Sequence, residues 1–375
     1  MISIGPIHQD KKKFQTMEKH KARYFESFVQ RAKINLKNLE SSKREMEDSI
    51  QRCYVETVHL KSDDSVKLIR LDASFILELF LRYYEEKWEV DDPMFVEAWL
   101  LDVVWHELLL LENQLPFFVF EKLYQLAFPN NSNSTPSLNE LTFNLNLNTH
   151  MKNTNVEIQH FTDLLKFFHL PPSNKLPYRD TKLTSPKYSA TQLREAGVTF
   201  KVDSRKCPLN LDFKNGMLDF PLLKFQHTTE ALIQNIMALE QCDYRRQAYI
   251  TDFYLMSDHL INTSEDVDLL SDEGIIDNRL GDSNAMTAMI NNLNKGIFRR
   301  DMNSDYYDLC KVLNVFYEKP WHRLKATLKH EYFSTPWGTA STIAAIFLLV
   351  LTLYRKYAQS SKQFRFNSYV IRMVV

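Results

Sequence analysis

The most restrictive feature of this 375-residue sequence is an uncharged segment near its carboxy terminus, from Gly338 to Tyr354. Seventeen residues in a helix span about 26 Å, close to the roughly 30 Å hydrocarbon core of a bilayer. Trp337 and Tyr354 stand at its two ends, where amphipathic rings favour the membrane interface, and Arg355 and Lys356 follow at once. The segment predicts a single membrane-spanning helix. The alternative is a buried helix of a soluble core, because the segment is short.

The charges around this segment leave its orientation open. Four Lys and Arg residues lie within eighteen residues before it, and five lie in the basic tail 355–375, which has no acid. These numbers are too even for the positive-inside rule to decide. We expect a single-pass membrane protein, with the plasma membrane as one candidate location. The start of the sequence, 1–6, lacks the pattern of a signal peptide.

Glycine is scarce, with 7 residues in 375, and few positions can therefore adopt a positive φ at low cost. This scarcity disfavours turn-rich β folds and favours helices. Apolar residues at helical spacing predict the same elements directly. Helices are expected at 16–55, 66–84, 94–111, 117–128, 156–168, 229–242, 247–261, 264–270, 283–295 and 304–333.

Two regions depart from the helical pattern. Residues 209–213 and 217–220 flank Asn215-Gly216, a strong signal for a β-hairpin, and 198–202 reads as a short strand. Residues 129–155 are rich in Asn and Ser and predict a surface loop or insert. The expected fold is mainly α, with a multi-helix soluble domain at 1–336, one small hairpin, a transmembrane helix at 337–354 and a short tail.

No pattern of catalytic, cofactor-binding or metal-ligating residues survives a physical check. His106-Glu107 begins like a zinc-protease helix, but Leu110 stands where the second His is needed. No glycine-rich phosphate loop or nucleophile elbow is present, and the four cysteines are scattered. Net charge is −1, which argues against nucleic-acid binding. We expect no cofactor, metal or identifiable small-molecule ligand.

Three groups of polar residues interrupt apolar segments. Asp72 lies on the apolar stripe of the second helix, Glu112-Asn113-Gln114 interrupts the run from 108 to 120, and Glu240-Gln241 ends another apolar helix. Buried carboxylates need partners, so these residues predict structural capping and pairing of core Arg or Lys. The alternative is a convergent acid pair for hydrolysis or metal binding.

The same segments together resemble a plant family known as domain of unknown function 247. The motifs that carry the resemblance are Ser3-Ile4-Gly5-Pro6, Leu71-Asp72, the run LLLLENQLPFF at 108–118, Glu195-Ala196-Gly197-Val198, Glu240-Gln241-Cys242 and Thr335-Pro336-Trp337. The resemblance implies a plant protein with a helical domain and a carboxy-terminal membrane segment. It implies no activity, and association of some grass members with self-recognition implies a recognition role.

The sequence also departs from the family pattern. Ala73-Ser74 stands where Gly-Cys is common, Gln234 replaces a common Arg, and the tail after Leu353 differs. Family members usually have residues before the Ser-Ile-Gly-Pro motif, so truncation is an expectation. We expect a non-enzymatic recognition or signalling protein with a protein partner. An unrecognised hydrolase using buried carboxylates and a structural membrane scaffold are the alternatives.

Overall fold

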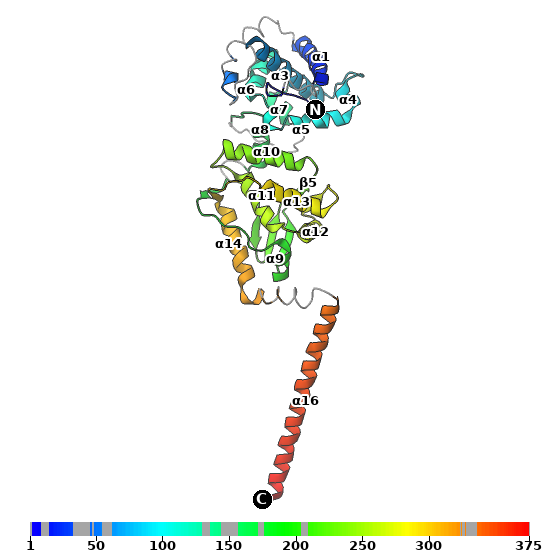
Figure 1. Cartoon of the computed structure of the whole chain (residues 1–375), viewed down its shortest axis with the longest axis vertical. Helices are drawn as coiled ribbons and strands as arrows, with labels where there is room; N and C mark the ends of the chain where they lie inside the picture. The colour runs from blue at the N-terminus through cyan, green and yellow to red at the C-terminus, as the bar shows by residue number, and fades with distance from the viewer. Residues whose placement is uncertain are drawn as a thin grey trace.

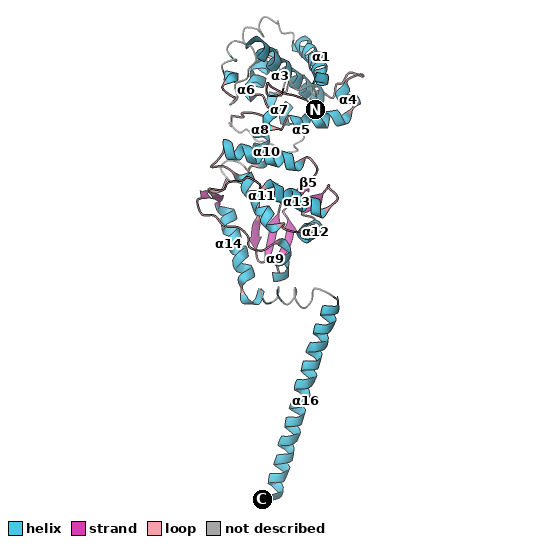
Figure 2. Cartoon of the chain, in the orientation of Figure 1, coloured by secondary structure: helices cyan, strands magenta, loops and turns pink. Residues whose placement is uncertain are grey.

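The computed structural model describes residues 2–8, 15–32, 46, 49–54, 62–129, 136–143, 157–171, 176–203, 209–322, 324, 327 and 336–374. Figure 1 shows an amino-terminal part, a carboxy-terminal part stacked on it at α10, and one long separate helix, α16. Figure 2 shows that helices dominate the described chain and that the strands cluster in the carboxy-terminal part. The prediction of a mainly helical fold is confirmed.

The amino-terminal part is built around one central helix. Its elements are α1 (Gln15–Ala32), α3 (Ser62–Glu85), α4 (Pro93–Val96), α5 (Ala98–Glu107), the 3-10 turn η2 (Leu111–Asn113), α6 (Phe117–Ala127), α7 (Leu138–Phe143) and α8 (Phe161–His169). Phe75, Ile76 and Leu79 of α3 are fully buried. Tyr24 and Phe28 of α1 join them in one core, as the helical spacing of the apolar residues predicts.

Two predicted elements differ from the structure here. The helix expected at 94–111 is divided, because Glu97 leaves helical geometry (φ −111°, ψ 78°) between α4 and α5. The loop expected at 129–155 contains α7, whose Leu141 is fully buried. Much of that insert, at 130–135 and 144–155, lies outside the described residues, as does 33–45 of the first predicted helix.

The carboxy-terminal part mixes helices with very short strands. Its elements are β1 (Arg179–Asp180), α9 (Ala190–Ala196), β2 (Thr199–Val202), β3 (Asp212–Lys214), β4 (Met217–Phe220), β5 (Leu223–Phe225), α10 (Thr229–Cys242), α11 (Tyr249–Leu260), α12 (Ser264–Asp272), β6 (Ile276–Asn278), α13 (Ser283–Leu293), β7 (Met302–Asn303) and α14 (Ser304–Glu318). Figure 1 places α14 along one side of this part.

The predicted hairpin is present as antiparallel β3 and β4. Asn215 (φ 54°) and Gly216 (φ 80°) form its turn, as a primed two-residue turn requires. The hairpin is not alone, because β2 pairs in parallel with β4, β5 pairs in parallel with β6, and β1 pairs with β7. Strands of two to four residues are too short to show an alternating pattern in the sequence, which is why most of them were not predicted.

Two large hydrophobic cores, and a small third cluster of Ile233, Met237 and Leu293, lie within the described part of the region 1–336, which was expected to be one domain. The first is formed by residues up to α8 and the second by residues from α8 onward. Helix α8 serves both, with Leu164 in the first core and Leu165 in the second. Across this junction, the Leu111 N–H donates to Asn235 Oδ1 of α10 at 2.8 Å.

Helix α16 (Pro336–Val374) is 39 residues long. Within it, Thr339–Gln359 is long and apolar enough to cross a membrane, and no part of that window is buried against the rest of the protein. The helix extends past the predicted end at Tyr354, so Arg355 and Lys356 lie on it and not in a separate tail.

Candidate functional site

Asp72 fixes the amino-terminal segment to the core. Its carboxylate is fully buried on α3, with Lys21 Nζ of α1 at 2.7 Å from Oδ1. The Gly5 N–H donates to Oδ2 at 2.8 Å, and Lys21 also donates to the Ser3 backbone oxygen. Burial raises the pKa of Asp72 to about 6, although Lys21 and the Gly5 N–H oppose that rise. The Asp72 carboxylate therefore has a structural role, because it pairs with Lys21 and accepts from the Gly5 N–H.

Asn113 and Gln114 hold the other side of this segment. Asn113 Oδ1 accepts from the Ile4 N–H at 2.6 Å, and its Nδ2 donates to the Ile2 oxygen at 3.2 Å. The Gln114 side chain joins the ends of two helices, since Nε2 donates to the Leu110 oxygen at 2.8 Å and Oε1 accepts from the Phe161 N–H at 3.0 Å. Both amides therefore satisfy buried backbone groups.

Glu112, the third member of that run, is exposed. The 3-10 turn η2 directs Asn113 inward and leaves Glu112 on the surface. The expectation that Glu112 is a buried, partnered carboxylate is therefore wrong, because one turn can place adjacent side chains on opposite sides.

Glu240 is the second buried carboxylate that the sequence singled out. It is fully buried near the end of α10 and accepts from the Thr251 N–H at 2.8 Å, the Thr251 hydroxyl at 2.7 Å and the Ile250 N–H at 3.2 Å. It thereby caps the start of α11. Burial raises its pKa to about 7, against these three donors and Lys166. Gln241 is half-buried, and its Oε1 accepts from the Phe298 N–H at 3.3 Å.

Lys166 of α8 lies in the same junction between the two cores. Its side chain is fully buried, with Nζ 3.2 Å from the centre of the Tyr244 ring. Burial lowers the pKa of Lys166, and the charges of Glu240 and Asp163 oppose that decrease. A buried amine with acids nearby is a feature that active sites share with structural networks.

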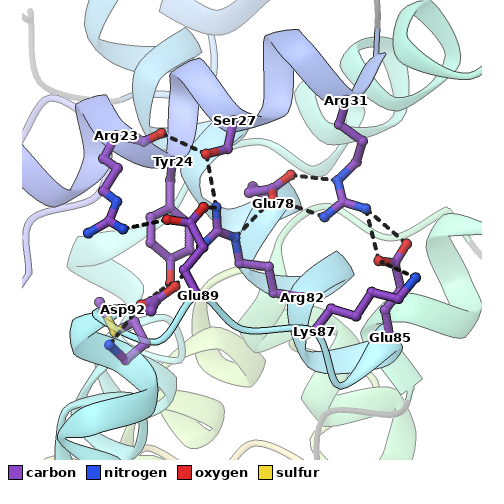
Figure 3. Close-up of polar contacts among 11 residues, drawn as sticks. Arg23, Tyr24, Ser27, Arg31, Glu78, Arg82, Glu85, Lys87, Glu89 and Asp92 are labelled. Atoms are coloured by element: carbon purple, nitrogen blue, oxygen red, sulfur yellow. Dashed lines mark hydrogen bonds and ion pairs between the residues drawn. The ribbon is translucent and has the colours of Figure 1, made fainter.

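A larger polar network joins α1, α3 and the start of α4, and sequence reasoning did not identify it (Figure 3). Arg82 is its centre, with Nε 2.9 Å from Glu78 Oε1 and Nη1 2.6 Å from Asp92 Oδ2. The Tyr24 hydroxyl donates to Asp92 at 2.8 Å, and Arg31 contacts Glu78 at 2.9 Å. The signal was available, because Glu78 and Arg82 are four residues apart on a strongly apolar helix.

These acids do not converge on a shared cleft. Asp72 lies in the amino-terminal part, Glu240 at the junction of the two cores and Glu112 on the surface. Two surface hollows of about 430 and 440 Å³ are lined by other residues, at α10 with α13 and at the hairpin with α14. Among the described residues, no group of three His, Cys, Asp or Glu side chains is placed to hold a metal ion.

The predicted anchor residues lie on an exposed helix. Trp337 at its start and Tyr354 near the end of the apolar segment are 86% and 71% exposed. Arg355 and Lys356, the next two residues, are also exposed, and Gly338 lies in the first turn of the helix. No other part of the described chain buries the apolar window of this helix, and exposing so much apolar surface to water is costly.

Comparison with known proteins gives a family and two named relatives. The family described as DUF247, plant protein of unknown function, matches residues 1–351. The UPF0481 protein At3g47200 of Arabidopsis thaliana is 28% identical over 386 aligned residues, covering 94% of this chain and 80% of that protein. A putative UPF0481 protein of the same plant, At3g02645, is 25% identical over 173 residues, covering 45% of this chain and 32% of that protein. No solved structure matches the chain.

Proposed function

The chain belongs to the DUF247 family of plant proteins of unknown function, and we propose that it is a membrane-anchored recognition protein that acts through protein contacts. The observation that carries the proposal is the unburied apolar window Thr339–Gln359. Its length suits a bilayer, and its aromatic and basic ends suit the two interfaces. A bilayer would bury the apolar side chains of this helix, which the rest of the described chain leaves exposed.

The positions of the carboxylates favour recognition over catalysis. Asp72 and Glu240 are buried and each accepts hydrogen bonds from backbone N–H groups, which leaves them tied to the fold. Glu112 is exposed on the surface. A hydrolase that uses two of these acids would need both carboxylates to reach the same bond of a bound substrate, because paired carboxylates act from opposite sides of that bond.

Affinity capture after crosslinking in intact cells tests the recognition role. The full chain is expected to recover one protein in a fixed ratio, and replacing 336–375 with an unrelated single-pass helix should preserve that recovery. In this proposal, the insert at 129–155 contributes to the contact with the partner protein. Because α7 packs on α3, the informative deletion is 144–155, which leaves Leu138–Phe143 in place. The absence of any fixed-ratio protein would contradict the proposal.

The hydrolase alternative is tested with the three isosteric changes Asp72→Asn, Glu112→Gln and Glu240→Gln. Recognition predicts that Glu112→Gln leaves partner capture and thermal stability unchanged, since this side chain is exposed. Loss of a hydrolytic activity in a stable, folded Glu112→Gln protein would support the enzyme reading instead.

Orientation is tested with an exposed glycosylation sequon at Asn262-Thr263-Ser264. Protease protection of microsomes, combined with an endoglycosidase shift, reports which side of the membrane carries the body. The variant Asn262→Gln is the matched control for the shift. A shift at Asn262 places the partner outside the cytosol, and full protease sensitivity without a shift places it in the cytosol.

A further inference from the structure

Four large apolar side chains are exposed within ten residues at α4 and the start of α5. Val90, Phe95, Val96 and Trp99, here called the α4–α5 surface, are 92%, 58%, 64% and 61% exposed. The Phe95 ring stacks on the ring of Trp88, with centroids 6.2 Å apart and planes at 20°. Figure 1 shows α4 at the side of the amino-terminal part, away from α9 to α14. Large exposed apolar side chains gathered in so short a segment are typical of interaction sites.

The charge around this surface is acidic. Residues 83–102 contain seven Asp and Glu residues and one Lys. Glu86, Glu97 and Asp102 are exposed, and their carboxylates form no ion pair within the described part of the chain. Glu89 and Asp91 are different, because Arg23 contacts both of them. The surface therefore offers an apolar centre with unpaired negative charge beside it.

A rigid base supports the α4–α5 surface. Asp92 caps α4 by accepting from the Met94 N–H at 3.0 Å, and Pro93 occupies the first helical position. Arg82 and Tyr24 both donate to the same Asp92 carboxylate (Figure 3). Since α4 is fixed before any partner arrives, little ordering is needed on binding.

We propose that the α4–α5 surface binds a basic amphipathic helix of a partner protein. The apolar side of that helix packs on Phe95, Val96 and Trp99, and its Lys and Arg side chains pair with the exposed acids. The same acids repel an anionic bilayer, which disfavours this surface as a lipid contact. The inference rests on the proposed recognition function and specifies the chemistry of the partner.

Peptide display tests this directly. A library of random 20-residue helical peptides is selected against the full chain in nanodiscs of neutral lipid, after depletion on empty nanodiscs. Enriched peptides are expected to carry net positive charge and apolar residues at i, i+3, i+4 and i+7. Trp99→Ala should weaken their binding at least tenfold. The control Phe298→Ala removes a still more exposed aromatic ring from the other part of the protein and should change binding less than twofold.

Charge reversal supplies a second readout. The double variant Glu97→Lys and Asp102→Lys should shift the selection toward acidic peptides, and circular dichroism should show unchanged helix content because both positions are exposed. Enrichment of neutral or acidic peptides on the natural protein, equal binding to Trp99→Ala, or no enrichment at all would overturn the proposal. If partner capture from cells persists in Trp99→Ala, only this surface is wrong, and the recognition function stands.

Discussion

At the scale of single residues, two buried carboxylates are stabilised in different ways. Asp72 faces a cation, Lys21, whereas Glu240 accepts mainly from neutral donors at the start of α11. Burial raises the pKa of both groups, that of Glu240 to about 7 and that of Asp72 to about 6, against the donors that each carboxylate accepts from. Above neutral pH, keeping the ionised Glu240 carboxylate buried therefore costs free energy that its hydrogen-bond donors do not fully offset.

The raised pKa of Glu240 predicts that the stability of the fold depends on pH. A raised folded-state pKa means that the folded protein binds the proton more tightly, so the stabilisation is present below the unfolded pKa of 4.5 and is lost as pH rises through about 7. The loss amounts to up to about 3 kcal/mol over this window. Glu240→Gln should flatten the urea-unfolding free energy between pH 4.5 and 7. Glu112→Gln, at an exposed site, is the control, and equal flattening in both variants would contradict the prediction.

Gly5 supports a second prediction at this scale. Its φ is +74°, and an added Cβ would lie 2.9 Å from the Gln114 backbone oxygen, next to the hydrogen bond to Asp72. Gly5→Ala should therefore reduce thermal stability through both backbone strain, about 1 kcal/mol, and this contact. Gly281→Ala is the matched control, since Gly281 has φ +80° with nothing within 4 Å. Equal losses in the two variants would show that the contact has no effect.

At the scale of elements, sequence patterns locate most helices but not what joins them. Asp72 on an apolar stripe predicts a buried partner, yet nothing in the sequence identifies Lys21, which belongs to another helix. The apolar run 108–120 predicts burial for Glu112 and Asn113 alike, and only the 3-10 turn separates them. The Asn215-Gly216 turn, in contrast, has the positive φ values that the predicted hairpin requires. Local backbone conformation could therefore be predicted from the sequence, whereas contacts between elements distant in the chain could not.

The network at Arg82 predicts how α1, α3 and α4 depend on one another. Arg82→Met would leave Glu78 and Asp92, both almost fully buried, without their shared cation. Breaking a buried pair in this way costs about 3–5 kcal/mol. Arg23→Met removes a partly exposed Arg from exposed acids and should cost about 0–1 kcal/mol. Chemical denaturation measures both, and similar losses would show that burial of the Arg82 network is unimportant.

At the scale of the whole molecule, two cores share one helix, and a separate helix follows them. The sequence predicted a helical domain at 1–336 but not its two large cores, because apolar periodicity shows which residues are buried and not with which neighbours they cluster. Leu164 and Leu165 are adjacent in the chain and belong to different cores. The long apolar helix was predictable for the opposite reason, since its length and composition alone make it a candidate to cross a membrane.

The last prediction concerns that helix. Leu349 stands at the middle of Thr339–Gln359 and is exposed. In a bilayer, Leu349→Arg places a charge at the midplane, which costs about 2.5–3.5 kcal/mol on insertion scales. Gln359→Arg at the end of the span reaches the headgroups and should cost little. Alkaline extraction of cell membranes should therefore release the first variant and retain the second. If the helix only bound another protein surface, the position of the added Arg along the helix would not change membrane retention. Equal retention of both variants would therefore contradict a membrane-spanning α16.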